Sequence, residues 1–325
     1  MGRVTLLLVF ALALTPSVGA QQDPVVQPSQ PAVFRSGASM VAVSVTVLDG
    51  RKLVSGLNQQ DFEIYEDGVQ QQVQFFESRS VPLDVILLLD TSSSMNDKME
   101  VVHQAARGFM KMLRPGDRGA VVAFADSVNV VQALTLDTAA IASAINSVQA
   151  KGSTSLRNAI YVALKEFGRG AQDTGEVRRQ AIAVLSDGED TASIVSFDDV
   201  MALARKTGVN IYSIALQSQY GALRSGSDRR YFSDADYSMK SLAQETGGQA
   251  FFPTSVNDLK GVYDAIAGEL SAQYSLGYAP SNARNDGRFR RIIVRVTSNP
   301  SFRPRARSGY TADTPRATVG FLRSR

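Results

Sequence analysis

The chain has 325 residues, a length that fits one large or two ordinary domains. Of these residues 44% are hydrophobic and 20% charged, which is typical of globular proteins. It has no cysteine, which excludes disulfides and cysteine nucleophiles, and its single histidine, His103, excludes metal sites built from several histidines. The formal net charge is +3, but residues 284–325 alone carry +9, from 11 Arg and two Asp. Aromatic residues are not interleaved with these arginines as single-stranded nucleic acid requires. We therefore expect no nucleic-acid partner and assign the arginines to solvent-facing strand positions and the chain end.

Residues 1–20 have the pattern of a secretory signal peptide. Arg3 adds positive charge, residues 4–14 form an apolar core, and small residues stand at 18–20, where a signal peptidase cleaves. The apolar core of 11 residues is too short to cross a bilayer. We expect an exported protein, periplasmic or secreted, without a transmembrane segment in the mature chain. Residues 21–39, rich in Gln, Pro and Ser, predict a flexible leader.

Residues 40–80 predict part of an antiparallel β domain. Valines alternate with small and polar residues over 41–47, and Asp67-Gly68 is a strong hairpin signal. Strand patterns return at 274–278 and 289–296. The simplest arrangement is one β domain built from residues 40–80 and 272–311, with the intervening chain inserted, and a disordered tail at 312–325.

Residues 81–271 alternate between strand and helix patterns, which predicts an α/β fold with a doubly wound, mainly parallel sheet and helices on both faces. The expected strands are 83–90, 120–124, 128–134, 181–185, 209–216 and 249–252, and the expected helices lie near 97–113, 141–148, 156–167, 197–206, 237–245 and 259–270.

The first strand of this segment ends in a group of oxygen ligands. Its apolar run, 85–89, is typical of a strand covered on both faces, and the carboxyl end of such a strand is where ligands bind in α/β sheets. Asp90, Ser92 and Ser94 follow at alternate positions, so a curved loop can direct them to one point. The alternative is that Ser94 or Asn96 only caps the next helix.

Two later loops carry the same chemistry. Thr154 lies in a glycine-containing loop before a helix, and Asp187 follows another apolar strand. If the three loops meet at the carboxyl edge of the sheet, their carboxylates and hydroxyls surround one cation. Such oxygen ligands suit Mg²⁺, Mn²⁺ or Ca²⁺ rather than Zn²⁺.

These motifs resemble those of von Willebrand factor A (VWA) domains. Residues 90–94 look like their DxSxS signature, 152–156 their threonine loop and 185–188 their third metal loop, in the same order. The flanks, including 61–68 and 274–278, are similar to an exported bacterial "VWFA-related" family.

The resemblance implies a metal-ion-dependent adhesion site that binds Mg²⁺. Ser92, Ser94 and Thr154 would bind the ion directly, and Asp90 and Asp187 largely through water. A protein partner would complete the coordination with an acidic side chain. In the resembling domains the last helix shifts on ligand binding, which here would act on the adjoining β strand; a rigid boundary is the alternative.

Two other functions stay open. Aspartate after a buried strand also begins haloacid-dehalogenase-like phosphotransferases, but the position of their second acid is Ser92, so the usual proton-transfer group is missing. A serine hydrolase would need His103 as base and a G-x-S-x-G elbow, which the sequence lacks. We therefore expect a binding module rather than an enzyme. A structural envelope protein whose metal only braces the loops is the remaining alternative.

The signal pattern gives a direct prediction. Mass spectrometry of secreted or periplasmic material is expected to find an amino terminus near Gln21, because cleavage follows the small residues at 18–20. Recovery of the chain from the cytoplasm with Met1 intact would contradict export.

Overall fold

The computed structural model describes residues 40–78, 81–170, 178–187, 190–216 and 233–312. The expected signal peptide and leader, and the expected tail apart from its first residue, lie outside the described residues; that residue, Ala312, is buried and donates to the carbonyl of Arg288, so the prediction of disorder is wrong there. A six-stranded sheet forms the centre of the α/β part, and all of its neighbouring strands are parallel except for one antiparallel pair, β7 and β8. The predicted fold class is confirmed. In spatial order the strands are β11 (Ala250–Phe251), β10 (Asn210–Ala215), β9 (Arg179–Ser186), β6 (Leu83–Asp90), β7 (Arg118–Phe124) and β8 (Val128–Thr135).

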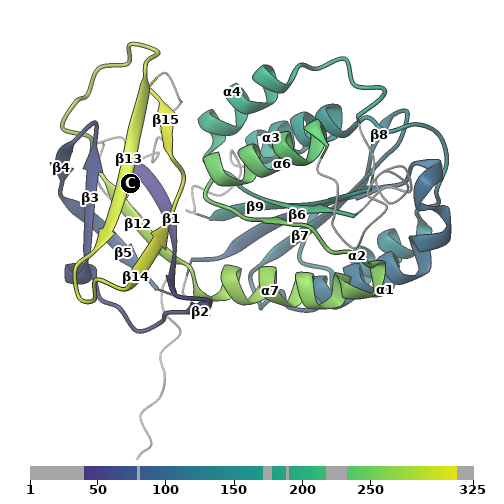
Figure 1. Ribbon diagram of the computed structural model, residues 1–325, viewed down its shortest axis with the longest axis horizontal. Coiled ribbons are helices and arrows are strands. Elements are labelled where there is room, and N and C mark those ends of the chain that lie inside the picture. Colours follow the sequence, from purple (N-terminus) through teal and green to yellow (C-terminus); the bar gives the residue numbers. More distant parts are fainter. Residues whose placement is uncertain (1–39, 79–80, 171–177, 188–189, 217–232, 313–325) are drawn as a thin grey trace, which may run out of the picture. The chain divides into compact units, whose positions relative to one another are not determined.

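Helices cover both faces of this sheet (Figure 1). One face packs against α1, α2 and α7 and the other against α3, α4 and α6. The helices are α1 (Met99–Met110), α2 (Thr138–Ser147), α3 (Leu156–Gly170), α4 (Phe197–Thr207), α6 (Asp234–Glu245) and α7 (Leu259–Ala272). The helix expected near 97–113 is shorter than predicted, because a 3-10 segment, η2 (Ser93–Lys98), precedes α1.

The burial of strand β6 on both faces explains why its sequence is continuously apolar. All eight of its residues are buried, and they alternate between two cores. Leu87 and Leu89 face α1 and α7, whereas Ile86 and Leu88 face α3. Full burial of one such side chain stabilises the fold by roughly 1.5–3 kcal/mol. The strand is thereby fixed, and its last residue, Asp90, is held at a defined position.

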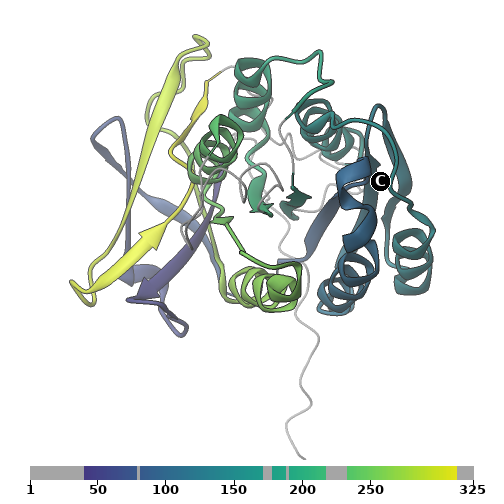
Figure 2. The same cartoon turned by 45° about the vertical axis from the view of Figure 1, so that its right-hand side comes forward.

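The strands from the two ends of the chain form two antiparallel sheets around a separate core (Figures 1 and 2). The sheet β14-β1-β12-β5 places β12, from the C-terminal segment, between two N-terminal strands, and the other sheet has the order β15-β13-β3-β4. The strands are β1 (Val41–Asp49), β2 (Lys52–Leu53, paired with β1), β3 (Phe62–Glu66), β4 (Val69–Gln71), β5 (Val73–Glu77), β12 (Tyr274–Tyr278), β13 (Phe289–Val296), β14 (Phe302–Arg305) and β15 (Gly309–Thr311).

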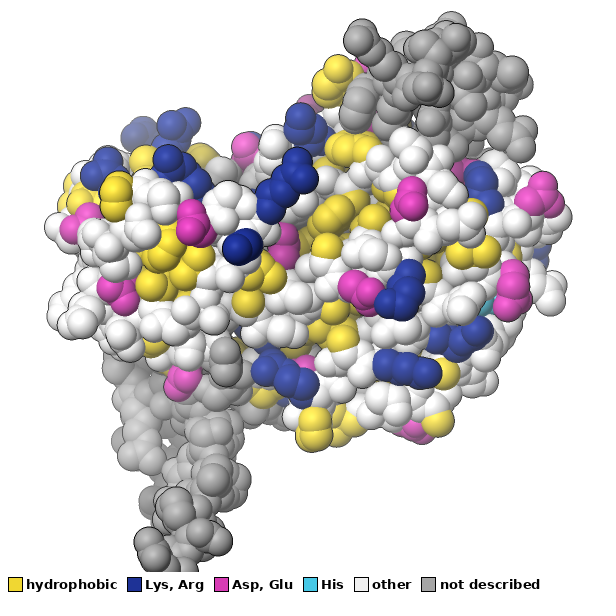
Figure 3. Space-filling view, turned by 60° about the horizontal axis from the view of Figure 1, so that its bottom comes forward, with side chains coloured by type: hydrophobic (Ala, Val, Ile, Leu, Met, Phe, Trp, Pro, Cys, Tyr) yellow, Lys and Arg dark blue, Asp and Glu magenta, His cyan; other side chains and the backbone are white. Residues whose placement is uncertain are grey.

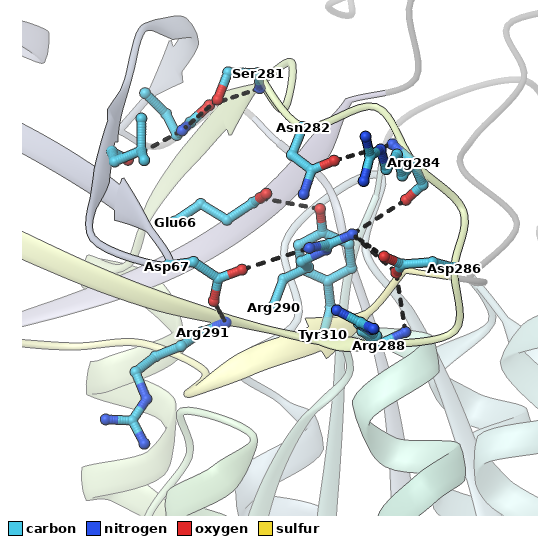
Figure 4. A network of polar contacts seen from close by, with 12 residues as sticks. Glu66, Asp67, Ser281, Asn282, Arg284, Asp286, Arg288, Arg290, Arg291 and Tyr310 are labelled. Atoms are coloured by element: carbon cyan, nitrogen blue, oxygen red, sulfur yellow. Dashed lines mark hydrogen bonds and ion pairs between the residues drawn. The ribbon is translucent and has the colours of Figure 1, made fainter.

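Arginines of the C-terminal segment do more than line solvent-facing positions. Arg290 is buried and bonds both carboxylate oxygens of Asp286, at 2.8 and 2.9 Å, with Asp67 3.7 Å away (Figure 4). Nearby, the buried Glu66 accepts hydrogen bonds from the hydroxyls of Tyr278 and Tyr310. On the face drawn in Figure 3, Lys and Arg side chains are interspersed with acidic and apolar ones. The prediction that these arginines are all exposed is therefore wrong for Arg290.

Helix α7 joins the α/β part to the β sheets through one residue, Gln273. Its side-chain amide donates to the hydroxyl of Tyr212 in β10 at 3.0 Å and to Thr46 in β1 at 3.4 Å. One turn earlier, the buried Glu269 forms an ion pair with Arg305, which also donates to Gln249 at 2.6 Å. Burial raises the pKa of Glu269, and the charge of Arg305 opposes that rise. No helix among the described residues is both long and apolar enough to cross a membrane.

The Glu269–Arg305 pair gives a stability prediction. Arg305→Met leaves Glu269 buried without its ion-pair partner and is expected to lower the free energy of unfolding by about 3 kcal/mol, whereas the double variant Glu269→Leu/Arg305→Met recovers most of the loss. Lys260 is the control, because its pair with Asp264 on the same helix is exposed, and Lys260→Met should cost less than about 0.5 kcal/mol. Urea unfolding measures all three, and equal losses for Arg305→Met and Lys260→Met would contradict the prediction.

Candidate metal site

The first predicted loop follows β6 and is fixed by backbone hydrogen bonds to its neighbours. The N–H of Thr91 donates to the carbonyl of Phe124 at 2.8 Å, which holds the loop against β7. The N–H of Ser93 donates to the carbonyl of Gly152 at 3.0 Å, and that of Lys151 to Thr91 at 2.6 Å. The DxSxS loop and the threonine loop are therefore joined directly.

The second loop needs a glycine. Gly152 has a φ of +81°, and a Cβ there would lie 2.2 Å from a carboxylate oxygen of Asp126. The other oxygen of Asp126 accepts the N–H of Ser153 at 2.7 Å, and this bond lowers the pKa of Asp126. Asp126 thus holds the backbone on the amino-terminal side of Thr154, whose side chain is buried.

The third loop is tied to the second. The N–H groups of Thr191 and Ala192 both donate to the carbonyl of Thr154, at 3.0 and 2.9 Å. Asp190 accepts from the backbone N–H of Arg157 at 2.8 Å and pairs with its guanidinium at 2.9 Å. These contacts connect the segment after Asp187 to the start of α3 and to the threonine loop.

Four of the five predicted residues, Asp90, Ser92, Ser94 and Asp187, are joined by hydrogen bonds where the three loops converge. Asp90 accepts the backbone N–H of Ser92 at 2.8 Å and the hydroxyl of Ser186 at 2.6 Å. The hydroxyls of Ser92 and Ser94 are 3.0 Å apart, and that of Ser94 donates to Asp187 at 2.7 Å. Ser94 is the exposed member of the group, which leaves it on the solvent side.

Thr154 is connected to this group by hydrogen bonds of its own backbone and of the neighbouring backbone. Its backbone nitrogen lies 3.3 Å from the hydroxyl of Thr191, and its carbonyl takes the two hydrogen bonds described above. The neighbouring backbone, Gly152, bonds to Ser93 of the first loop. The structure therefore brings the loops of all five predicted residues together, and it links four of the five by hydrogen bonds that involve their side chains.

Two carboxylates share this small volume. Asp90 is fully buried and Asp187 is 4% exposed. Burial raises the pKa of Asp90, and the charge of Asp187 raises it further, whereas hydrogen bonds from Ser186 and Ser92 lower it. A cation at this position would relieve the cost of both charges.

The donor set fits a hard divalent cation. It consists of carboxylate and hydroxyl oxygens, the ligands preferred by Mg²⁺, Mn²⁺ and Ca²⁺. The described residues contain no cluster of three or more His, Cys, Asp or Glu side chains that could hold a metal. The proposed site is of a different type, because it has two carboxylates and three hydroxyls. Ser92, Ser94 and Thr154 would hold the ion together with Asp90 and Asp187.

Two polar residues at the site were not predicted. Ser186 lies beside Asp90 because β6 and β9 are parallel with Leu89 opposite Leu185, and this register could have been inferred from the two strand ends. Lys98 forms an ion pair with Asp187 and donates to the carbonyl of Ser94 at 3.1 Å. Its position four residues after Ser94 was visible in the sequence, but the direction of its side chain could not be predicted from it.

Comparison with known proteins agrees with this arrangement. Residues 84–265 match the von Willebrand factor type A domain family. The chain belongs to this family. The resemblance drawn from the three loops is confirmed, and VWA domains are modules that bind protein ligands, commonly through a divalent metal.

The relatives and solved structures are distant. A UPF0353 protein from Mycolicibacterium paratuberculosis (strain ATCC BAA-968 / K-10) is 26% identical over 269 residues, covering 78% of this chain and 73% of the relative. A von Willebrand factor type A structure from Catenulispora acidiphila is 14% identical with a TM-score of 0.47, covering 84% and 73% of the two chains. Proximal thread matrix protein 1 from the mussel byssus, solved with a zinc-occupied MIDAS motif, is 16% identical with a TM-score of 0.46, covering 59% and 48%.

The site assignment predicts loss of metal binding in one variant and not in its control. Asp90→Asn keeps the shape of the side chain but removes the charge, so Mn²⁺ affinity is expected to fall at least about 100-fold, a loss of roughly 2.7 kcal/mol. Asp97→Asn removes the same charge from an exposed position of η2 and should change the affinity less than about twofold. Calorimetry compares them, and equal Mn²⁺ affinity in the two variants would refute the assignment.

Proposed function

We propose that the chain is an exported binding module whose VWA domain holds Mg²⁺ between its three loops and captures a protein through an acidic side chain. The observation that carries the proposal is the meeting of Asp90, Ser92, Ser94 and Asp187 in one hydrogen-bonded group at the carboxyl edge of the sheet. Mn²⁺ and Ca²⁺ are the other cations that these oxygen ligands suit.

The chemistry of the donor set supports an acidic ligand. Ser92, Ser94 and Thr154, the residues proposed to bind the ion directly, are neutral hydroxyls, whereas Asp90 and Asp187 are proposed to act largely through water, so the ion remains attractive to a further anionic ligand. Ser94 is exposed, which puts one edge of the site within reach of a partner. A carboxylate from that partner is the hard oxygen ligand that such an ion prefers. The loops are fixed to one another by backbone bonds, so little ordering is required on binding.

We propose no catalytic activity for this site. General acid–base chemistry needs a titratable group within reach of the reacting atoms. The position of the second acid in phosphotransferases is Ser92, whose hydroxyl is 3.0 Å from that of Ser94. His103 lies on α1 with its pKa lowered by burial, and its side chain interacts with the backbone of Val148 rather than with the site.

Export is part of the proposal and rests on residues 1–20, which lie outside the described residues. The chain has no cysteine, so it forms no disulfide in either compartment. The binding site would then face periplasmic or extracellular proteins.

Partner capture is expected to require both the metal and Asp90. Immobilised mature protein should retain one or more envelope proteins in Mg²⁺, release them in EDTA, and fail to retain them as the Asp90→Asn variant, whereas Asp97→Asn behaves as wild type. Retention that survives EDTA in every variant would favour the structural alternative. Mg²⁺-dependent hydrolysis of a phosphate ester that is lost in Asp90→Asn would favour the phosphotransferase alternative.

A further inference from the structure

Lys98 supplies the metal site with a cation of its own. Lys98 is the last residue of η2, and its ammonium forms an ion pair with Asp187 and donates a hydrogen bond to the carbonyl of Ser94 at 3.1 Å. The side chain of Asp187 is 1% exposed and that of Lys98 19%. The negative charge of a buried carboxylate is thus balanced from within the chain.

Asp187 has both of its oxygens engaged. One accepts the hydroxyl of Ser94 at 2.7 Å and the other holds Lys98. Lys98 therefore contacts two of the five proposed metal-binding residues, Ser94 and Asp187. A divalent ion that uses Asp187 must share it with the ammonium or displace it, because two cations at one carboxylate repel each other.

We propose that Lys98 is a tethered cation that competes with the divalent metal for Asp187 and so sets the metal affinity of the site. The proposal rests on the function proposed above. Lys98 neutralises Asp187 before the metal arrives, and the metal gains less from the site than the same five donors would give without the lysine.

The competition also links metal binding to partner binding. When the metal takes Asp187, the ammonium of Lys98 loses its acceptor and becomes available at the partly exposed edge near Ser94. An acidic partner side chain then meets the ion and a nearby ammonium, which are complementary to its charge. The partner thus stabilises the metal-bound arrangement more than it would if Lys98 were a neutral residue.

Lys151 provides a matched control. It is an exposed lysine beside Gly152, and its backbone N–H donates to Thr91 of the first metal loop. Lys98→Met and Lys151→Met each remove one positive charge close to the same loops, but of these two lysines only Lys98 is paired with Asp187. Methionine retains a long apolar stem in both variants, so packing changes little.

Calorimetry of Mn²⁺ binding to the mature protein tests the proposal. Lys98→Met is expected to bind Mn²⁺ about 10-fold more tightly than wild type, and Lys151→Met to stay within about twofold of it. An affinity of Lys98→Met no higher than that of Lys151→Met overturns the role of Lys98 and leaves the metal site standing. Absence of Mn²⁺ binding in all three proteins overturns the proposed function and the role of Lys98 together.

Thermal unfolding gives a second readout. In EDTA, Lys98→Met is expected to melt at a lower temperature than wild type, because Asp187 stays buried without its cation. Saturating Mn²⁺ should then raise the melting temperature of Lys98→Met by more than it raises that of wild type or Lys151→Met. An equal Mn²⁺-induced rise in the three proteins overturns the competition.

Discussion

Two buried carboxylates at the ends of neighbouring parallel strands set the main constraint on this VWA domain. Asp90 ends β6 and Asp187 follows β9, and the two strands are paired along their length. Burial raises the pKa of Asp90, and its neighbour adds to the effect. Such an arrangement is costly unless positive charge and hydrogen bonds compensate it. Lys98, Ser186 and the serine hydroxyls supply part of that compensation, and we propose that a divalent ion supplies the rest.

The surrounding structure keeps these charges in a fixed geometry. The continuous burial of β6 holds Asp90 in place, and the three loops bond to one another through backbone groups and through the ion pairs Arg157–Asp190 and Lys98–Asp187. Gly152 is required in the threonine loop because a Cβ at this position would clash with the carboxylate of Asp126. The β sheets contact this unit through Gln273 and also through Arg305 and Ser308, which bond to Glu269, Gln249 and Glu245, so the stability of the β sheets and that of the α/β part are linked.

Local pattern in the sequence was sufficient to predict the fold and to select the five proposed donors, whose binding of a metal stays a prediction. The donors follow apolar strands or open helices, and strand order in an α/β fold places such loops at one edge. Side-chain direction was not accessible in the same way, which is why Lys98 was missed although it lies four residues from Ser94.

Contacts between distant residues were also beyond the sequence. Thr46 alternates with the buried valines of β1 and should face solvent, yet it is fully buried and accepts a hydrogen bond from Gln273, 227 residues further along the chain. The short strand β14 contains Pro304, which the pattern of a central strand disfavours, and the structure places it at a sheet edge, where proline is tolerated.

The most direct measurement is anomalous diffraction from crystals of the mature protein grown with Mn²⁺. A single strong peak bounded by the hydroxyls of Ser92, Ser94 and Thr154, with Asp90 and Asp187 beside it and the ammonium of Lys98 moved off Asp187, is the predicted result. Manganese bound elsewhere, with Lys98 still paired to Asp187 and no peak between the three loops, would contradict the proposal that these loops form a metal site.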